Sequence, residues 1–169
     1  MATGIGYDSH RFAHPGPLVL GGVTIESDVR LAGHSDGDVV CHAIIDAMLG
    51  AAAAGDIGEL FPDSDPAYRG ANSLDLLARA TQHVGKLGWR LAHADVVVVT
   101  ESPKLAPHRT AMRERLARAI GVSPDRISVK AKTNEGMGWI GRNEGMACIA
   151  VATLEGVSEG AGPRVETGV

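Results

Sequence analysis

Two short segments near the N-terminus carry residues that could bind a metal ion. Residues 6–10 contain Asp8 and His10, and residues 34–42 end in His42. Residues two apart in a strand point to the same face, so Asp8 and His10 are expected side by side on a first strand. His42 lies on a predicted helix. If that helix packs across the end of the strand, two imidazoles and one carboxylate converge with an open fourth position, which is typical of a catalytic zinc site.

The same residues are open to other interpretations. An Asp-x-His pair is common by chance, and a single His or Asp is more often structural than catalytic. The segment before residue 66 is nevertheless dense in Asp, His and Gly, where a structural loop would need few of them. Two His and one carboxylate also describe a non-haem Fe(II) site, and this alternative stays open.

Three further loop clusters could bind a ligand. Residues 56–65 are acidic, residues 100–106 join a buried strand to a helix, and residues 132–136 offer a Lys, a hydroxyl and a carboxylate. Strand ends and helix N-termini are where α/β folds bind anions, although a solvated turn, an ordinary connection and a capped turn are the structural alternatives. The chain has no P-loop and no legible Ser–His–Asp or Cys–His set. A metal with oxygen-rich loops therefore predicts a phosphorylated substrate.

The composition is that of an ordinary globular chain. Its 169 residues are 44% hydrophobic and 21% charged, enough for one domain with a sizeable core. The net charge of −4 argues against a nucleic-acid partner, because phosphate binding needs a basic face. No apolar run reaches the ~20 residues of a membrane span, and residues 1–12 lack a signal-peptide pattern. Cys41 and Cys148 are expected to be buried free thiols, which indicates the cytoplasm.

Periodicity predicts strands that alternate with helices. The expected strands are 2–10, 89–100, 127–131 and 146–154, with a hairpin at 18–25. The expected helices are 38–53, capped by Asp36 or Asp38, 73–84, capped by Asn72 or Ser73, and 108–120. The expected loops are 26–37, 55–70, 103–107 and 132–143. We therefore expect an α/β (α+β) fold, a two-layer sandwich with one mixed sheet and helices on one face, as a single domain of residues 1–155 with a flexible tail of residues 156–169.

Ordered motifs across residues 3–155 resemble the 2-C-methyl-D-erythritol 2,4-cyclodiphosphate synthase family of the non-mevalonate isoprenoid pathway. Any one motif would be a weak signal, but their order in one chain makes the resemblance specific. The motifs are Gly6-Tyr7-Asp8-Ser9-His10-Arg11-Phe12, Ala32-Gly33-His34-Ser35-Asp36-Gly37-Asp38 with His42, Gly55-Asp56-Ile57-Gly58 with Leu60-Phe61-Pro62-Asp63, Pro103-Lys104, and Lys132-Thr133-Asn134-Glu135 with Gly141-Arg142.

The resemblance implies a metal-dependent phosphorus–oxygen lyase. Its substrate would be 4-diphosphocytidyl-2-C-methyl-D-erythritol 2-phosphate, whose 2-phosphate attacks the β-phosphorus, so that the cyclic diphosphate forms and CMP leaves. Asp8, His10 and His42 would bind one Zn²⁺ per subunit. Glu135 would hold a second divalent cation, Mg²⁺ or Mn²⁺. Phosphoryl transfer needs positioning and charge neutralisation more than a covalent nucleophile, which agrees with these residue types.

The resemblance also implies the substrate contacts. His34 and Thr133 would stabilise the charge that builds on the phosphates in the transition state. Asp46 would either orient an imidazole or lie in solvent. The full set of expected substrate contacts is Asp8, His10, His34, Ser35, Asp56, Ile57, Gly58, Phe61, Pro62, Asp63, Ser64, Asp65, Thr100, Pro103, Lys104, Leu105, Ala106, Ala131, Lys132, Thr133, Asn134, Glu135, Trp139 and Arg142.

Members of this family are homotrimers with active sites between subunits, and they enclose an axial cavity that takes isoprenoid diphosphates. Trp139, Arg142 and Glu144 fall at the matching positions, where Arg142 either pairs with a diphosphate or, as the simpler interpretation, forms a trimer salt bridge with Glu144. Lys132 stands where many members carry Thr, and Trp139 where Phe is frequent, so the phosphate contact and the cavity width are expected to differ. A trimeric isoprenoid-diphosphate binding module without activity is the second alternative.

Overall fold

The computed structural model describes residues 1–33 and 35–157. Within them, one sheet has five strands and a separate hairpin has two. The strands are β1 (Ala2–Ala13), β2 (Leu18–Leu20), β3 (Val23–Ile25), β4 (Arg30–Leu31), β5 (Trp89–Val99), β6 (Ile127–Lys132) and β7 (Gly145–Gly156). The helices are α1 (Val39–Ala51), α2 (Ile57–Leu60), α3 (Ser73–Lys86), α4 (Arg109–Ile120) and α5 (Gly138–Gly141), with 3₁₀ turns η1 (Pro66–Tyr68), η2 (Ala106–His108) and η3 (Pro124–Arg126).

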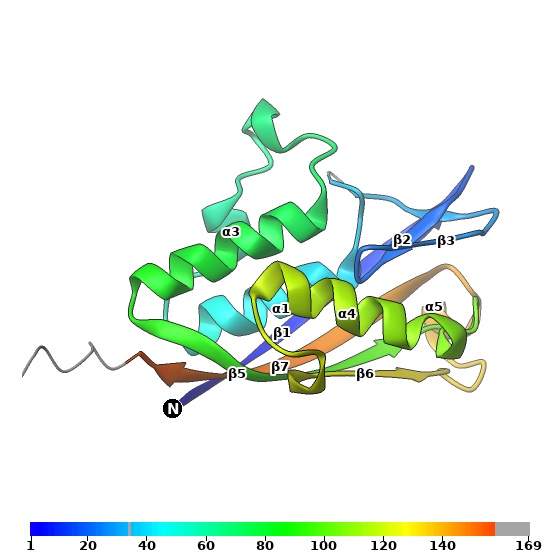
Figure 1. Cartoon of the computed structure of the whole chain (residues 1–169). Coiled ribbons are helices and arrows are strands. Elements are labelled where there is room, and N and C mark those ends of the chain that lie inside the picture. The colour runs from blue at the N-terminus through cyan, green and yellow to red at the C-terminus, as the bar shows by residue number, and fades with distance from the viewer. Residues whose placement is uncertain (34, 158–169) are drawn as a thin grey trace, which may run out of the picture.

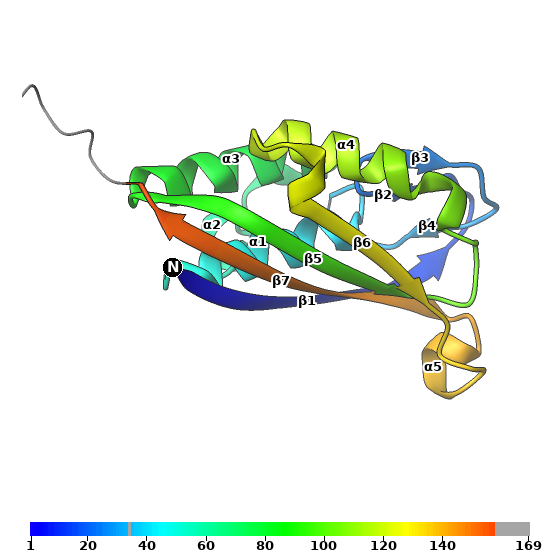
Figure 2. The ribbon, with the colours of Figure 1, turned by 60° about the horizontal axis from the view of Figure 1, so that its bottom comes forward.

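The sheet is mixed, as the sequence predicts. Its strand order is β4-β1-β7-β5-β6. Strand β7 lies antiparallel between β1 and β5, whereas β5 and β6 run parallel. Helices α1, α3 and α4 cover one face of this sheet and leave the other face bare, which Figures 1 and 2 show from two directions. The predicted two-layer sandwich with helices on one face is therefore confirmed.

Glycines in β1 bring α1 directly against the sheet. The even-numbered residues of β1 face the helix layer, because side chains alternate along a strand. A Cβ atom on Gly4 would clash with the Ala47 carbonyl oxygen, and one on Gly6 with the Ala43 carbonyl oxygen. The helix backbone can therefore lie on the strand backbone. The same alternation points the next two even residues of β1 at the first turn of α1.

The buried Asp38 fixes the start of α1. Its carboxylate accepts hydrogen bonds from the backbone N–H groups of Val40 and Cys41, so it is the N-cap of the helix. It also accepts from the N–H groups of Gly21 and Gly22 in the β2–β3 turn, at 2.9 and 2.7 Å. Both glycines have positive φ, which that turn requires. One carboxylate thus joins the hairpin to the helix that carries His42.

Most predicted elements are confirmed, and the differences involve short elements. The predicted loops contain β4, α2, η1, η2 and α5, which have two to four residues each and no periodic pattern to reveal them. Helix α1 passes through Gly50 and ends at Ala51 rather than Ala53. Strand β7 continues to Gly156, one residue into the predicted tail, and residues 158–169 lie outside the described part of the chain. No helix in residues 1–33 and 35–157 is long and apolar enough to cross a membrane.

Candidate metal centre and active site

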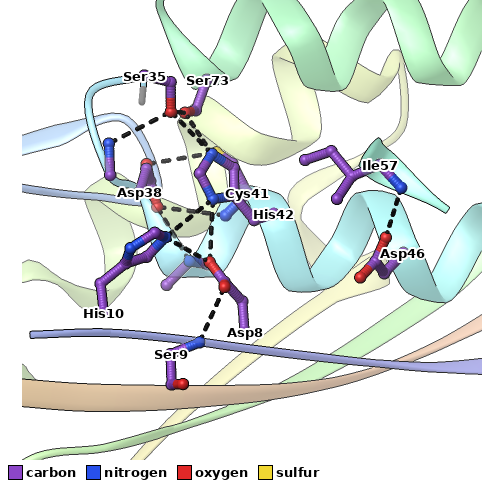
Figure 3. A network of polar contacts seen from close by, with 12 residues as sticks. Asp8, Ser9, His10, Ser35, Asp38, Cys41, His42, Asp46, Ile57 and Ser73 are labelled. Carbon is purple, nitrogen blue, oxygen red and sulfur yellow. Dashed lines mark hydrogen bonds and ion pairs between the residues drawn. The ribbon is translucent and has the colours of Figure 1, made fainter. Parts of the chain in front are cut away.

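Asp8, His10 and His42 converge as the sequence predicts (Figure 3). The Asp8 Oδ2 atom lies 3.0 Å from His10 Nε2 and 2.9 Å from His42 Nδ1. The two imidazole nitrogens lie 3.4 Å apart. Strand β1 supplies the first two side chains and the first turn of α1 supplies the third. In the described part of the chain, no other group of three His, Cys, Asp or Glu side chains comes together in this way.

The hydrogen bonds behind the imidazoles favour the tautomers that metal ligands need. His10 Nδ1 lies 2.7 Å from the Ala32 carbonyl oxygen, which can only accept, so Nδ1 keeps a proton and Nε2 is the nitrogen left for a metal. Without a metal, a proton on Nε2 donates to Asp8. His42 Nε2 lies 3.0 Å from the hydroxyl oxygens of both Ser35 and Ser73. Backing of this kind orients histidines in metal sites.

The electrostatics of the cluster also suit a cation. Burial on its own would raise the pKa of Asp8, but hydrogen bonds from His10 and His42 outweigh it and hold that pKa far below the ordinary range. The hydrogen bond to Asp8 raises the pKa of His10, against the opposing effect of burial. An ionised carboxylate thus faces two ring nitrogens at close range. Two nitrogens and one oxygen with room for a fourth ligand fit a catalytic Zn²⁺.

A cavity of about 230 Å³ opens beside the three residues. Its lining includes seven of the predicted contact residues, and these are Asp8, His10, Ser35, Ile57, Gly58, Phe61 and Asp63. Tyr68 and Leu76 also line it and were not predicted. Pro62, Ser64 and Asp65 do not line this cavity. Asp56 instead caps α2 by accepting from the Glu59 N–H at 2.9 Å.

Asp46 shapes this cavity rather than orienting an imidazole. Its carboxylate accepts a hydrogen bond from the backbone N–H of Ile57 at 2.8 Å (Figure 3). Asp46 also lines the cavity. Burial raises its pKa. Neither predicted role fits this half-buried carboxylate. It ties the start of α2 to α1, so the loop that follows stays over the metal centre.

An arginine from α3 holds the far wall of the cavity. The Arg79 guanidinium lies 5.7 Å from the ring centre of Phe61 and 5.3 Å from that of Tyr68. The two rings meet edge to face, with their centres 5.3 Å apart. Such contacts are typical cation–π and aromatic pairs. Together they fasten the loop between α2 and α3 onto the helix layer.

The other two predicted loops lie against each other at the ends of the parallel strands β5 and β6. The Thr100 N–H donates to the Lys132 carbonyl oxygen at 2.9 Å. One Glu101 carboxylate oxygen accepts from the N–H groups of Asn134 and Gly136, at 2.9 and 3.2 Å. Glu101 was not among the predicted site residues, and it holds the 132–136 loop in place.

Within that loop, the predicted pair of side chains is in contact. The Thr133 hydroxyl donates to Glu135 Oε1 at 2.8 Å. Glu135 has a φ of 52°, a left-handed conformation that non-glycine residues adopt rarely and that Ala53 and Asn143 also adopt in this chain. The cavity beside Asp8, however, is lined by no residue of the 100–106 or 131–136 segments. A single chain thus presents two separate halves of the predicted site.

Three more of the predicted residues can be placed in the structure, and these are Leu105, Arg142 and Trp139. The Leu105 side chain is buried in the core, so only its backbone is open to a ligand. Arg142 donates from Nε to Glu144 at 2.6 Å within one chain, whereas the predicted salt bridge was one in the trimer, which a single chain does not test. Trp139 is partly exposed on α5. His34 lies outside the described residues.

Comparisons with known proteins agree with this geometry. The sequence profile of the YgbB family matches residues 1–155. A 2-C-methyl-D-erythritol 2,4-cyclodiphosphate synthase from Gemmatimonas aurantiaca is 54% identical over 91% of this chain and 93% of its own length. A solved synthase of the same name, in a form bound to CDP, is 41% identical with a TM-score of 0.83 and covers 90% of this chain and 99% of its own. The bifunctional IspDF of Campylobacter jejuni is 44% identical with a TM-score of 0.89 over 92% of this chain, which spans 42% of that longer protein.

Proposed function

Because the chain belongs to the YgbB family, we propose that it converts 4-diphosphocytidyl-2-C-methyl-D-erythritol 2-phosphate to 2-C-methyl-D-erythritol 2,4-cyclodiphosphate and CMP. The observation that carries this proposal is the convergence of Asp8, His10 and His42 beside a cavity whose lining includes seven of the expected contacts. In the reaction, an oxygen of the 2-phosphate forms a bond to the β-phosphorus. The bond from that phosphorus to the bridging oxygen breaks, and CMP leaves with the oxygen. This makes the enzyme formally a phosphorus–oxygen lyase.

Asp8, His10 and His42 would hold Zn²⁺. When bound, the ion would polarise the β-phosphate as a Lewis acid and fix its orientation. The other residues of the site would position the substrate. Ser35 and Asp63, with the α2 segment held by Asp46, would receive the polyol end of the substrate in the adjoining cavity. Exclusion of water there favours the internal phosphate as the attacking group.

The 100–106 and 132–136 loops would receive the cytidine and its phosphates. Glu135, with its partner Thr133, is the candidate ligand of a second divalent cation, Mg²⁺ or Mn²⁺. Lys132 and Lys104 would add positive charge beside the phosphates. His34 would stabilise the transition-state charge together with Thr133. These assignments follow the resemblance in sequence, and the mutual contacts of the two loops support them.

The two halves of the site would be joined by trimer formation. The bare face of the sheet exposes Ile5, Tyr7, Ile149 and Val151, which are between 39% and 70% accessible. The register pairs Ile5 with Val151 and Tyr7 with Ile149, so the four side chains form one apolar patch across β1 and β7. A patch of this kind marks an interaction surface. A homotrimer packed through it would set the 100–106 and 132–136 loops of one subunit beside the metal centre of the next. Trp139 and Arg142 would lie near the axis, where an isoprenoid diphosphate would have to compete with Glu144 for Arg142.

The two buried free thiols, Cys41 and Cys148, support a reducing compartment, and we place the protein in the cytoplasm.

The reaction is tested by phosphorus NMR of the purified protein with the cytidine diphosphate ester, Zn²⁺ and Mg²⁺. We expect CMP and a cyclic diphosphate to appear together. A trimeric, zinc-loaded protein that gives no turnover but binds isoprenoid diphosphates would instead favour the binding module. Purified protein that contains iron and is purple or yellow-brown would favour the Fe(II) alternative.

A further inference from the structure

A chain of polar groups reaches from His42 away from the metal centre into the start of α3. His42 Nδ1 faces Asp8, while its Nε2 lies 3.0 Å from the Ser73 hydroxyl oxygen (Figure 3). Ser73 is the first residue of α3 and is fully buried. Its hydroxyl donates in turn to the carboxylate of Asp36. Two residues that the expected site omits thus stand directly behind one of its metal ligands.

The Asp36 carboxylate, at the far end of this series of polar groups, determines the direction of each hydrogen bond in it. The Asp36 carboxylate accepts from the Ser73 hydroxyl, from the Ser73 backbone N–H at 3.0 Å and from the Asp38 N–H at 3.2 Å. Because the only hydroxyl proton of Ser73 is given to Asp36, the Ser73 oxygen can only accept from His42. The proton of a neutral His42 is then on Nε2, and the Nδ1 lone pair points to the centre between Asp8 and His10.

We infer that Ser73 and Asp36 are positioning residues that hold His42 as an Nδ1 metal ligand. The inference rests on the metal site of the proposed function. The arrangement is a carboxylate–histidine–metal contact with a hydroxyl inserted between the carboxylate and the ring, and contacts of that class tune both ligand orientation and metal affinity.

Ser35 is a weaker candidate for the same role. Its hydroxyl is also 3.0 Å from His42 Nε2, but it accepts from the Gly37 N–H at 3.3 Å and no carboxylate takes its proton. The Ser35 hydroxyl also lies 3.3 Å from the Ser73 hydroxyl oxygen, so its proton can go to that oxygen or to the imidazole. Of the two serines, only Ser73 determines which ring nitrogen of His42 carries the proton.

The test measures zinc affinity without substrate, by competition with a chromophoric chelator. We expect Ser73→Ala and Asp36→Asn each to weaken zinc binding by about 10- to 100-fold. Asn reverses the hydrogen bond, because its amide can donate to the Ser73 oxygen while its carbonyl still accepts the Ser73 N–H. The Ser73 hydroxyl would then donate to His42 Nε2 and disfavour the ligand tautomer. Asp36→Asn also removes the acceptor of the Asp38 N–H, so thermal melts of this variant check the start of α1 as well. Ser35→Ala should weaken binding less than either.

Thr81→Val is the matched control, since it removes a hydroxyl of the same helix that donates to the Leu77 carbonyl oxygen at 2.8 Å, within its own helix and away from the metal centre. It should bind zinc as the wild type does. Circular dichroism melts of the metal-free variants separate loss of affinity from loss of fold. Proton NMR of the zinc form adds a direct signature, because the His42 Nε2–H should exchange slowly in the wild type and faster in Ser73→Ala.

Zinc affinity of folded Ser73→Ala and Asp36→Asn within about twofold of the wild type would overturn the inference, as would an equal loss in Thr81→Val. Failure of the proposed function is distinguishable from this result. A wild type that binds zinc tightly, with weakened variants, but gives no cyclic product would leave the positioning role standing and reject the reaction.

Discussion

His42 links the two segments of the metal centre, and the effect of removing it separates a catalytic metal from a structural one. The site lies at the edge of the core, whereas α1 itself is fixed by Asp38 and by close packing on Gly4 and Gly6. We expect His42→Ala to lose bound zinc and turnover while the melting temperature of the metal-free protein shifts by only about 1–4 °C. Zinc analysis, the phosphorus NMR assay and a thermal melt measure the three quantities.

His83→Ala is the control for that change, because His83 is a partly buried histidine near the end of α3, outside the cluster. It should keep both zinc and activity. An unfolded His42→Ala protein would show instead that the metal holds the fold together.

The pKa shifts of Asp8 and His10 predict how zinc stabilisation depends on pH. The lowered pKa of Asp8 stabilises the metal-free fold above about pH 4, and this contribution is lost as the pH falls further. The raised pKa of His10 stabilises the metal-free fold below about pH 6.5, and this contribution is lost as the pH rises through the folded-state pKa. Both contributions are therefore present between these limits.

Zinc needs both groups without their protons. Its gain in melting temperature should thus be larger at pH 8 than at pH 5.5, as measured by melts in chelator and in excess zinc. A gain that does not change with pH would contradict this account.

At the scale of elements, the packing of α1 on β1 sets the position of His42 relative to Asp8. Gly6→Ala places a methyl group against the Ala43 carbonyl oxygen, so the helix must move away from the strand. We expect a loss of about 1–3 kcal/mol in the free energy of unfolding, together with weaker zinc binding. Urea denaturation and the chelator competition measure the two effects.

Gly85→Ala is the matched control for that element. Gly85 lies in α3 with no atom near its added Cβ, so alanine should stabilise the protein by about 0.5–1 kcal/mol and leave zinc binding unchanged. Equal effects at the two glycines would rule out a special role for the close approach of α1.

The elements also show what the sequence could predict. Asp8 and His10 follow the two-residue period of a strand, and His42 lies one turn after the cap of a strongly apolar helix, so local rules placed each on its element. That the helix packs across the strand was a condition, which the structure meets at Gly4 and Gly6. Ser73 and Tyr68 could not be placed, because their approach to the site depends on how α3 and its preceding loop pack on α1. The four-residue α2 has no period that could reveal it.

At the scale of the whole molecule, the bare face of the sheet predicts assembly. Tyr7→Glu puts a charge into the apolar patch of β1 and β7, where Tyr7 is 55% exposed in the single chain. If this face packs in a trimer, the charge must be buried or the trimer must dissociate. We expect a smaller particle in light scattering after gel filtration. Activity should fall as well, because the 100–106 and 132–136 loops would no longer reach a neighbouring metal centre.

Leu87→Glu is the matched control, because it also replaces an exposed hydrophobic side chain with a carboxylate. Leu87 is 49% exposed at the end of α3 and lies outside the patch. That variant should remain trimeric and active. A Tyr7→Glu protein of unchanged size would mean that subunits meet through another face.

The single carboxylate of Asp38 has a consequence for local motion. The amides of Gly21, Gly22, Val40 and Cys41 share this one buried acceptor, although the turn and the helix are 16 or more residues apart in sequence. If either segment frays, the buried carboxylate loses two of the N–H donors that satisfy it. We expect hydrogen exchange to give the four amides a common free energy of opening. The hairpin and the helix that carries His42 would then open together.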